Sequence, residues 1–201
     1  MNRREVMFGA TYGLLGLGTL TVAKGEESKN IDVVKILTNV RSAMQFSDFP
    51  IPEEDLMKIL QIGLNAPSGH NLQPWFLSVV TDRVLLANID KAAGVGQGRL
   101  SLTGSPTVIF VCIDNSSFAE FGAGTICDRM TVAANLMGYG AKTVMTPCKV
   151  ANEQFKDKLG IPKKYSINVA LLLGTEISPS VDGASGATSR EPLVNKVVRI
   201  R

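Results

Sequence analysis

The sequence predicts an α/β fold that forms one domain after a short N-terminal segment. Helical and strand-like patterns alternate along the chain from about residue 30 onward. Four short apolar runs have the length and the Val, Ile and Leu content of buried strands. The chain has 201 residues, of which 45% are apolar and 19% charged, so it can bury one sizeable core.

Two amphipathic helices are predicted before the first strand. Residues 31–40 carry apolar side chains at helical spacing, and Asp32 lies early enough to favour the N-terminus of a helix. Residues 52–66 form the second helix, because proline is tolerated in a first turn and the acidic residues after it complement the helix dipole. Pro67 ends this helix. Its packed face is expected to comprise Leu56, Ile59, Leu60 and Gly63.

Strands and helices then alternate. In chain order we expect a strand at 75–80, a helix at 82–93, a strand at 107–113, a long helix at 118–136, a strand at 141–146, a short helix at 152–159 and a strand at 168–173. The last of these is continuously apolar, which is typical of a central position in a sheet. Residues 178–189 are rich in Gly, Ala and Ser and predict a loop.

The C-terminal tail at 197–200, Val-Val-Arg-Ile, has the composition of an isolated strand. So short a strand is stable only when it pairs with an existing sheet edge. We expect it to pair with another subunit, and the alternative is a frayed terminus.

Residues 1–29 have a signal-like profile, and residues 30–201 are taken as the domain. A positive start at Arg3-Arg4 precedes a weakly apolar, glycine-containing run at 6–23. The paired arginines favour a twin-arginine signal and a periplasmic location, although Val6-Met7 matches that pattern only in part. The alternatives are an uncleaved anchor, which would be the only membrane contact, and an N-terminal helix of a cytoplasmic protein.

Charge and cysteine content exclude several function classes. A formal charge of +3 with scattered lysines and arginines disfavours nucleic-acid binding. Three cysteines without C-x-x-C spacing and a single histidine provide no usual metal-ligand set, so no metal site is predicted. The cysteines are interpreted as small buried hydrophobes.

The sequence from Asn65 to Trp75 predicts a binding loop. A Pro-Ser-Gly turn follows the helix, and Asn71 and Gln73, two apart on extended backbone, would aim amide groups at one planar ligand. The alternative is an ordinary connection between a helix and a strand.

No side chain is predicted to act as a nucleophile, acid or base. Ser68 and His70 lie too close together in one turn for a nucleophile and its base, and no G-x-S-x-G is present. The glycine-rich run at 94–98 follows a helix and precedes a strand, which is the reverse of a dinucleotide-binding loop. The absence of a nucleophile, acid or base among the side chains points to a cofactor that carries the reaction itself.

Several motifs, taken in order, resemble those of FMN-dependent nitroreductase-family proteins. They are Val-Arg-Ser-Ala-Met-Gln-Phe at 40–46, Ile-Pro-Glu-Glu-Asp-Leu at 51–56, Ala-Pro-Ser-Gly-His-Asn-Leu-Gln-Pro-Trp at 66–75, Gly-Ala-Gly at 122–124, Ala-Ala-Asn-Leu-Met-Gly-Tyr-Gly at 133–140, Leu-Gly-Ile-Pro at 159–162 and Arg-Glu-Pro-Leu at 190–193. Together they extend over about residues 31–198.

The resemblance implies a mixed central sheet flanked by helices and a domain-intertwined homodimer with two FMN sites. The residues that it places against the flavin phosphate and ribityl chain are Arg41, Ser42 and Arg190. Those that would approach from the partner subunit are Pro67, Ser68, Gly69 and Asn71.

Two further segments would contact the flavin ring. Gln97 stands where the family places an amide side chain against the edge of the flavin. The alternative is that Gln97 is a loop residue without a role in binding. Pro147, Cys148 and Lys149 match a loop beside the isoalloxazine ring, where the backbone matters more than the thiol.

The resemblance also implies an oxidoreductase with a ping-pong cycle. A small-molecule donor such as NAD(P)H would reduce the flavin and leave before a nitroaromatic, quinone or similar conjugated acceptor binds. Two departures support the alternative of a non-catalytic or degenerate flavin-binding protein. Val40 and Met44 stand where the family often has basic residues, one near the phosphate and one near the flavin pyrimidine.

Overall fold

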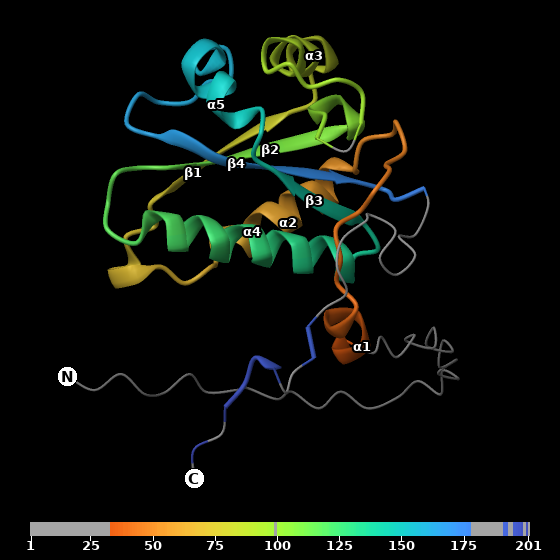
Figure 1. Ribbon diagram of the computed structural model, residues 1–201, viewed down its shortest axis with the longest axis vertical. Helices are drawn as coiled ribbons and strands as arrows, with labels where there is room; N and C mark the ends of the chain where they lie inside the picture. Colours follow the sequence, from red (N-terminus) through yellow and green to blue (C-terminus); the bar gives the residue numbers. More distant parts are fainter. Residues whose placement is uncertain (1–32, 99, 178–190, 193–194, 199, 201) are drawn as a thin grey trace, which may run out of the picture. The chain divides into compact units, whose positions relative to one another are not determined.

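The computed structural model describes residues 33–98, 100–177, 191–192, 195–198 and 200. A four-stranded sheet lies between two layers of helices (Figure 1). The strands, in their spatial order, are β1 (Trp75–Val80), β2 (Thr107–Ile113), β4 (Ser166–Gly174) and β3 (Gly140–Val144). The helices are α1 (Val33–Thr38), α2 (Glu53–Leu64), α3 (Arg83–Ala92), α4 (Ala119–Leu136) and α5 (Cys148–Val150).

The strand register gives the sheet two distinct ends. Trp75 pairs with Ile113, and Ile113 pairs with Ser166, so these residues share what we call the Trp75 end. Gly140 pairs with Gly174 at the opposite end, which we call the Gly140 end. Helix α4 leads directly into β3, so its C-terminus lies at the Gly140 end.

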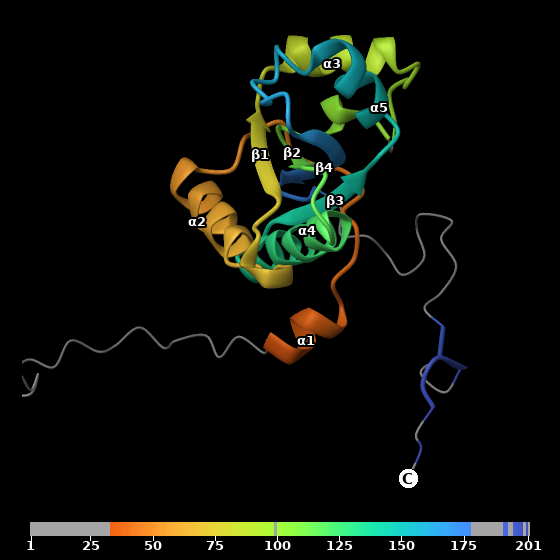
Figure 2. The same ribbon diagram turned by 90° about the vertical axis from the view of Figure 1, so that its left-hand side faces the viewer.

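Each face of the sheet has its own apolar core, because alternate side chains of a strand point to opposite faces. Val108, Phe110 and Cys112 of β2 pack in the core that α3 and α5 cover. Ile109 and Val111 pack in the core beneath α2 and α4. Figure 2, turned by 90°, shows the two helical layers on either side of the sheet.

Most predicted elements are confirmed. The strands at 75–80 and 107–113 have the predicted bounds, and the other strands and the helices α2, α3 and α4 differ from prediction by about two residues at their ends. Leu56, Ile59 and Gly63 are buried on α2 as expected, and Leu60 is half-buried. Helix α1 is shorter than predicted within the described residues and buries none of its side chains.

The predicted helix at 152–159 is wrong in position. Helix α5 begins at Cys148, and Ala151–Phe155 continues it as a π-helical turn. The Asn152 amide does not cap a helix. Its nitrogen donates to the Ile167 carbonyl at 2.9 Å and its oxygen accepts the Ile167 N–H at 2.8 Å, which ties the helix to the start of β4.

The sheet is antiparallel within the described chain, whereas a mixed sheet was expected. All three strand pairings are antiparallel. Residues 197, 198 and 200 are not in a strand, and residue 199, the loop at 178–189 and the signal-like segment at 1–29 lie outside the described residues. Pairing of the tail with another subunit and the domain boundary therefore stay predictions. None of the described helices is both long and apolar enough to cross a membrane.

Candidate functional site

The loop between α2 and β1 is a tight turn fixed by Ser68. The Ser68 carbonyl accepts the Asn71 N–H at 3.0 Å, and its hydroxyl accepts the Gln73 N–H at 3.0 Å. His70, Asn71 and Gln73 have positive φ values of 51°, 55° and 47°. The expectation of extended backbone from Asn71 to Gln73 is therefore wrong. The Gln73 amide donates back to the Asn71 carbonyl at 3.4 Å, while the Asn71 side chain is exposed.

This loop packs against the first turns of α4. The Thr125 hydroxyl donates to the Pro67 carbonyl at 3.3 Å. Gly69 lies against the Phe118 ring, and a Cβ at Gly69 would come within 3.1 Å of Phe118 Cδ2. Phe118 itself has a φ of 67°, which is rare for a bulky residue.

Backbone strain is concentrated at this contact. Among the described residues, the non-glycine positions with positive φ are His70, Asn71, Gln73 and Phe118. Such conformations cost free energy and persist at ligand sites where the surrounding packing enforces them. The geometry therefore favours a binding role for this loop over that of a simple connection.

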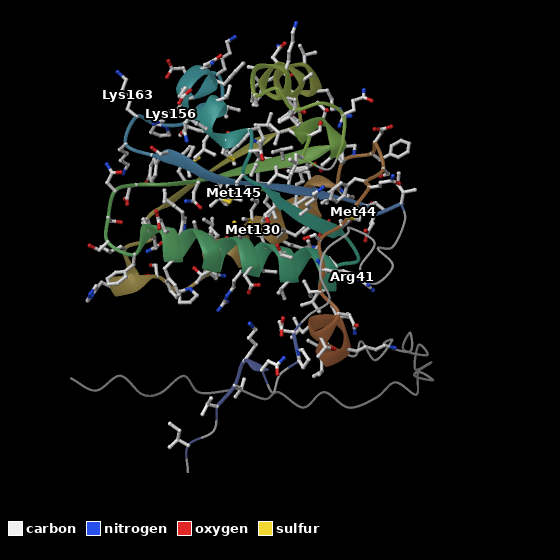
Figure 3. All side chains as sticks on the ribbon, viewed as in Figure 1. Arg41, Met44, Met130, Met145, Lys156 and Lys163 are labelled. Carbon is white, nitrogen blue, oxygen red and sulfur yellow. The ribbon has the colours of Figure 1, made fainter. Side chains whose placement is uncertain are left out.

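The segment that carries Arg41 and Ser42 lies at the Gly140 end of the sheet. The Ala43 N–H donates to the Ala141 carbonyl at 2.8 Å, and Phe46 forms a β-bridge with Glu176. A Cβ at Gly140 would lie 2.7 Å from the Ala43 Cβ, so glycine is needed for this close approach. Arg41 and Ser42 are both exposed. Figure 3 shows Arg41 and Met44 together near the end of α4.

Sequence reasoning missed Glu176. Its carboxylate oxygen Oε1 accepts the Met44 N–H at 3.1 Å, so a negative charge lies beside the segment that the resemblance places at the flavin. No local motif marks this residue, because only the pairing of residues 45–47 with residues 175–177, just after β4, brings it there.

The structure does not bring the two groups of predicted flavin residues together in one chain. Arg41 and Ser42 lie at the Gly140 end, whereas Gly69 and Asn71 lie at the Trp75 end, beside the N-terminus of α4. Helix α4 has 18 residues and is therefore about 27 Å long. The two groups therefore lie toward opposite ends of this helix.

Two of the three residues of the predicted ring loop, Cys148 and Lys149, begin α5. Pro147 is the residue before the helix, and Lys149 is exposed. The Cys148 Sγ lies 3.6 Å from the Val144 carbonyl, and burial raises the pKa of its thiol to about 11. The thiol is therefore protonated at neutral pH, and the backbone and the Lys149 ammonium are the groups that remain for binding.

The interpretation of the cysteines as buried hydrophobes is confirmed. Cys112, Cys127 and Cys148 are all buried and unpaired. Burial raises the pKa of the first two thiols to about 12. No group of three potential metal ligands occurs among the residues that the structure describes.

Gln97 lies on an exposed loop that the buried carboxylate of Asp90 anchors. Asp90 accepts the Ser101 hydroxyl at 2.7 Å, the Leu102 N–H at 2.9 Å, and the N–H and hydroxyl of Thr103 at 3.1 and 3.2 Å. This loop follows α3, on the face of the sheet opposite α2 and α4. Asp90 is a second residue that sequence reasoning missed. Arg190 lies outside the described residues.

Comparison with known proteins finds similarity to one family. The sequence profile of the Nitroreductase family matches residues 37–97, which include Arg41, Ser42, the strained loop and Gln97. A protein of Archaeoglobus fulgidus, provisionally named NADH dehydrogenase/NAD(P)H nitroreductase, is 29% identical over 152 residues. That match covers 71% of this chain and 84% of the relative. The chain is therefore similar to nitroreductase-family proteins.

Solved nitroreductase structures share the fold. The nitroreductase with bound FMN from Desulfitobacterium hafniense superimposes with a TM-score of 0.72 at 22% identity, covering 84% of this chain and 98% of that one. The nitroreductase with bound FMN from Bacteroides fragilis gives a TM-score of 0.71 at 17% identity, covering 85% and 99%. The motif order noted in the sequence thus corresponds to the nitroreductase architecture.

Proposed function

We propose that this chain belongs to the nitroreductase family and is an FMN-dependent oxidoreductase that works as a homodimer. The observation that carries the proposal is that its two groups of flavin residues lie toward opposite ends of α4, a helix about 27 Å long. One flavin mononucleotide cannot contact both groups within one chain. Two copies in an antiparallel arrangement would supply the Arg41 group from one subunit and the Asn71 group from the other.

The residues at both ends have the chemistry that FMN requires. The exposed Arg41 guanidinium suits a phosphate, because its planar fork donates two parallel hydrogen bonds to an oxyanion. The exposed Asn71 amide both donates and accepts, as the edge of an isoalloxazine ring does. When bound, FMN would supply the transfer of hydride or electrons.

The protein's own contribution would be orientation of the ligand. The Ser68 hydrogen bonds and the contact of Gly69 with Phe118 hold the loop rigid, so little ordering is needed when a ligand binds. The protonated Cys148 thiol is unsuited to nucleophilic attack. In the ping-pong cycle that we propose, the donor and then a nitroaromatic, quinone or similar acceptor would use one flavin face.

Mixed dimers provide a direct test of the shared site. Arg41→Ala and Asn71→Ala should each lower the flavin-to-protein ratio of the homodimer. A heterodimer of the two variants would have one doubly impaired site and one intact site, so it should recover about half of the wild-type flavin. If each site lay within one subunit, the heterodimer would recover none. That result would overturn the proposed arrangement.

The donor needs a separate experiment, since residues 1–29 resemble an export signal and NAD(P)H is scarce outside the cytoplasm. We propose export to the periplasm and a donor other than a nicotinamide. The mature domain would be mixed with NADH, NADPH or a quinol under stopped flow while flavin reduction is followed. Rapid reduction by a nicotinamide alone would argue for a cytoplasmic protein.

The Glu176 carboxylate beside Met44 favours a second candidate, a degenerate flavin-binding protein. A negative charge at this position would repel both the phosphate of FMN and the negative charge of the reduced flavin. A yellow dimer that reduces quinones supports the enzyme. A colourless protein that takes up no added FMN supports the degenerate alternative.

A further inference from the structure

Five lysines are concentrated between the start of α5 and the start of β4. We call them the lysine surface, and they are Lys149, Lys156, Lys158, Lys163 and Lys164. Four of these side chains are exposed and Lys156 is half-buried. Residues 148–165 hold only two acids, Glu153 and Asp157, so their net charge equals the +3 of the whole chain. The rest of the chain is formally neutral, and its positive excess is gathered on this one segment.

The lysine surface is not neutralised within the described part of the chain. Lys156 Nζ donates to the Lys163 carbonyl at 2.9 Å, and Figure 3 shows these two residues close together. This bond satisfies one N–H but brings no negative charge. None of the five lysines forms an ion pair with a residue that the structure describes. Their charge is therefore available to a partner.

Aromatic rings support two of the lysine side chains. Lys158 Nζ lies 5.7 Å from the centre of the Phe155 ring. Lys164 Nζ lies 4.8 Å from the centre of the Tyr165 ring, which is itself stacked on Phe76. Both rings pack against the apolar core, so they restrict the ammonium groups to positions on the surface. A partner would thus meet charges that need little ordering when it binds.

The composition of the lysine surface favours an acidic protein over a phosphate-rich partner. Arginine is the usual residue where phosphate is bound, because its planar fork donates two parallel hydrogen bonds, and residues 148–165 contain none. A lysine ammonium is a compact, strongly hydrated charge, which suits brief and water-rich contacts. Glu153 and Asp157 would repel a continuous row of phosphates, whereas they would pair with the basic groups of a protein of mixed charge.

The lysine surface begins beside the predicted position of the flavin ring. Lys149 belongs to the loop that the resemblance places next to the isoalloxazine ring, and the helical stretch from Cys148 to Phe155 is about 12 Å long. Weak electron-transfer complexes bury less than about 1,200 Å² in total, or about 600 Å² on each partner. A contact of that area is roughly 28 Å across, so a carrier centred on Lys156 and Lys163 would also cover Lys149.

We propose that the lysine surface docks a small acidic electron-carrier protein, which serves as the electron donor. Two reduced carriers would each give up one electron in turn. This pair of electrons, with two protons from solvent, is what a two-electron acceptor such as FMN takes up. The inference rests on the proposed function, because it needs a flavin near Lys149. It goes beyond that function by assigning the class of the donor and the surface that recognises it.

Binding is measured first and needs no flavin activity. The full chain would be titrated with a plant-type ferredoxin, an acidic carrier of low potential, and with cytochrome c, a basic carrier. We expect only the ferredoxin to bind at about 0.01 M salt, and its binding to be lost near 1 M salt, where the screening length is about 3 Å. A carbodiimide joins amines to carboxylates in contact. It should link the ferredoxin to lysines within residues 148–165, as located by mass spectrometry.

A double variant tests the lysine surface at about 0.1 M salt, where charges more than about 10 Å away are largely screened. Lys158→Gln with Lys163→Gln should weaken ferredoxin binding about three- to tenfold. Neither side chain forms a hydrogen bond or an ion pair with a described residue, so circular dichroism and flavin content should match those of wild type. The matched control is Lys91→Gln with Arg129→Gln. It removes the same charge from exposed positions on α3 and α4, and should leave binding unchanged.

The outcomes distinguish this inference from the proposed function. A chain that takes up FMN and reduces quinones with a small-molecule donor, yet binds ferredoxin no more tightly than the double variant does, would overturn the inference alone. Binding to vesicles of phosphatidylglycerol and phosphatidylcholine, but not to ferredoxin, would also overturn it in favour of a membrane surface.

Two further results involve the flavin. A chain that binds ferredoxin through the lysine surface but takes up no FMN would overturn the proposed function and, with it, the role of the partner as a donor. Slower flavin reduction by ferredoxin in the double variant, with unchanged reduction by dithionite, would support both.

Discussion

The buried carboxylate of Asp90 should be the main anchor of the loop that carries Gln97. Asp90 is only 5% exposed and accepts four hydrogen bonds from Ser101, Leu102 and Thr103. Each such bond contributes about 1 kcal/mol net, so Asp90→Ala should lower the free energy of unfolding by about 4 kcal/mol. Asp90→Asn retains one acceptor oxygen but turns an NH₂ group toward a donor. This variant should lower the free energy of unfolding by about 1–3 kcal/mol.

Urea unfolding followed by circular dichroism measures both variants. Asp128→Ala is the matched control, because Asp128 is exposed on α4 and should change stability by less than about 0.5 kcal/mol. Amide exchange in residues 94–103 should rise in Asp90→Ala even under native conditions. A loss of less than about 1 kcal/mol, with unchanged exchange, would refute the role of Asp90 as an anchor.

Three further predictions concern packing and ionisation. Gly140→Ala should lower the free energy of unfolding by about 1–3 kcal/mol, measured by thermal or urea unfolding, because its Cβ would collide with Ala43. The same variant should lower FMN occupancy. Gly124→Ala is the control, since a Cβ at Gly124 would meet open space. The Tyr139 hydroxyl, 2.6 Å from Asp55, lowers the pKa of that carboxyl, so its stabilisation is present above the ordinary aspartate pKa and is lost as pH falls through the lowered value. Tyr139→Phe should therefore be less stable than wild type near pH 7, and a pH series of unfolding curves should show the difference shrinking below about pH 4. Native protein at pH 8 should resist thiol reagents until denaturant is added, because burial raises the pKa values of Cys112, Cys127 and Cys148 to about 12, 12 and 11.

Local patterns were sufficient for most of the fold. The strands β1 and β2 are short, mostly apolar runs bounded by turn residues, so their composition and length identify them without tertiary information. The start of α5 was misplaced for a physical reason. Asn152 lies within the helical continuation of α5, and only the position of Ile167 shows that its side chain ties this segment to the start of β4.

The turn of the candidate site was predictable because its signal is local. Pro67 and Gly69 mark this turn, whereas its role in binding stays a prediction. The positive φ of Gln73 was not predictable, because the contacts with α4 and the Ser68 hydroxyl enforce it. Glu176 carries no local signal either, since its place depends on the pairing of segments far apart in the sequence.

The charge around Met44 gives a last prediction, which rests on the proposed function. By the resemblance, Met44 stands where the family often has a basic residue, which would stabilise reduced flavin, and the Glu176 carboxylate lies beside it. Met44→Lys should raise the flavin midpoint potential by about 20 mV, equivalent to about 1 kcal/mol for a two-electron couple. Glu176 should offset part of that gain by pairing with the new ammonium.

The double variant Met44→Lys with Glu176→Gln should therefore raise the potential further than Met44→Lys alone. Met44→Gln is the uncharged control and should leave the potential near that of wild type. Redox titration of the flavin measures all three. Equal potentials in the single and double variants would show that Glu176 does not act on the flavin, and its bond to the Met44 N–H would then serve only to hold the segment in place.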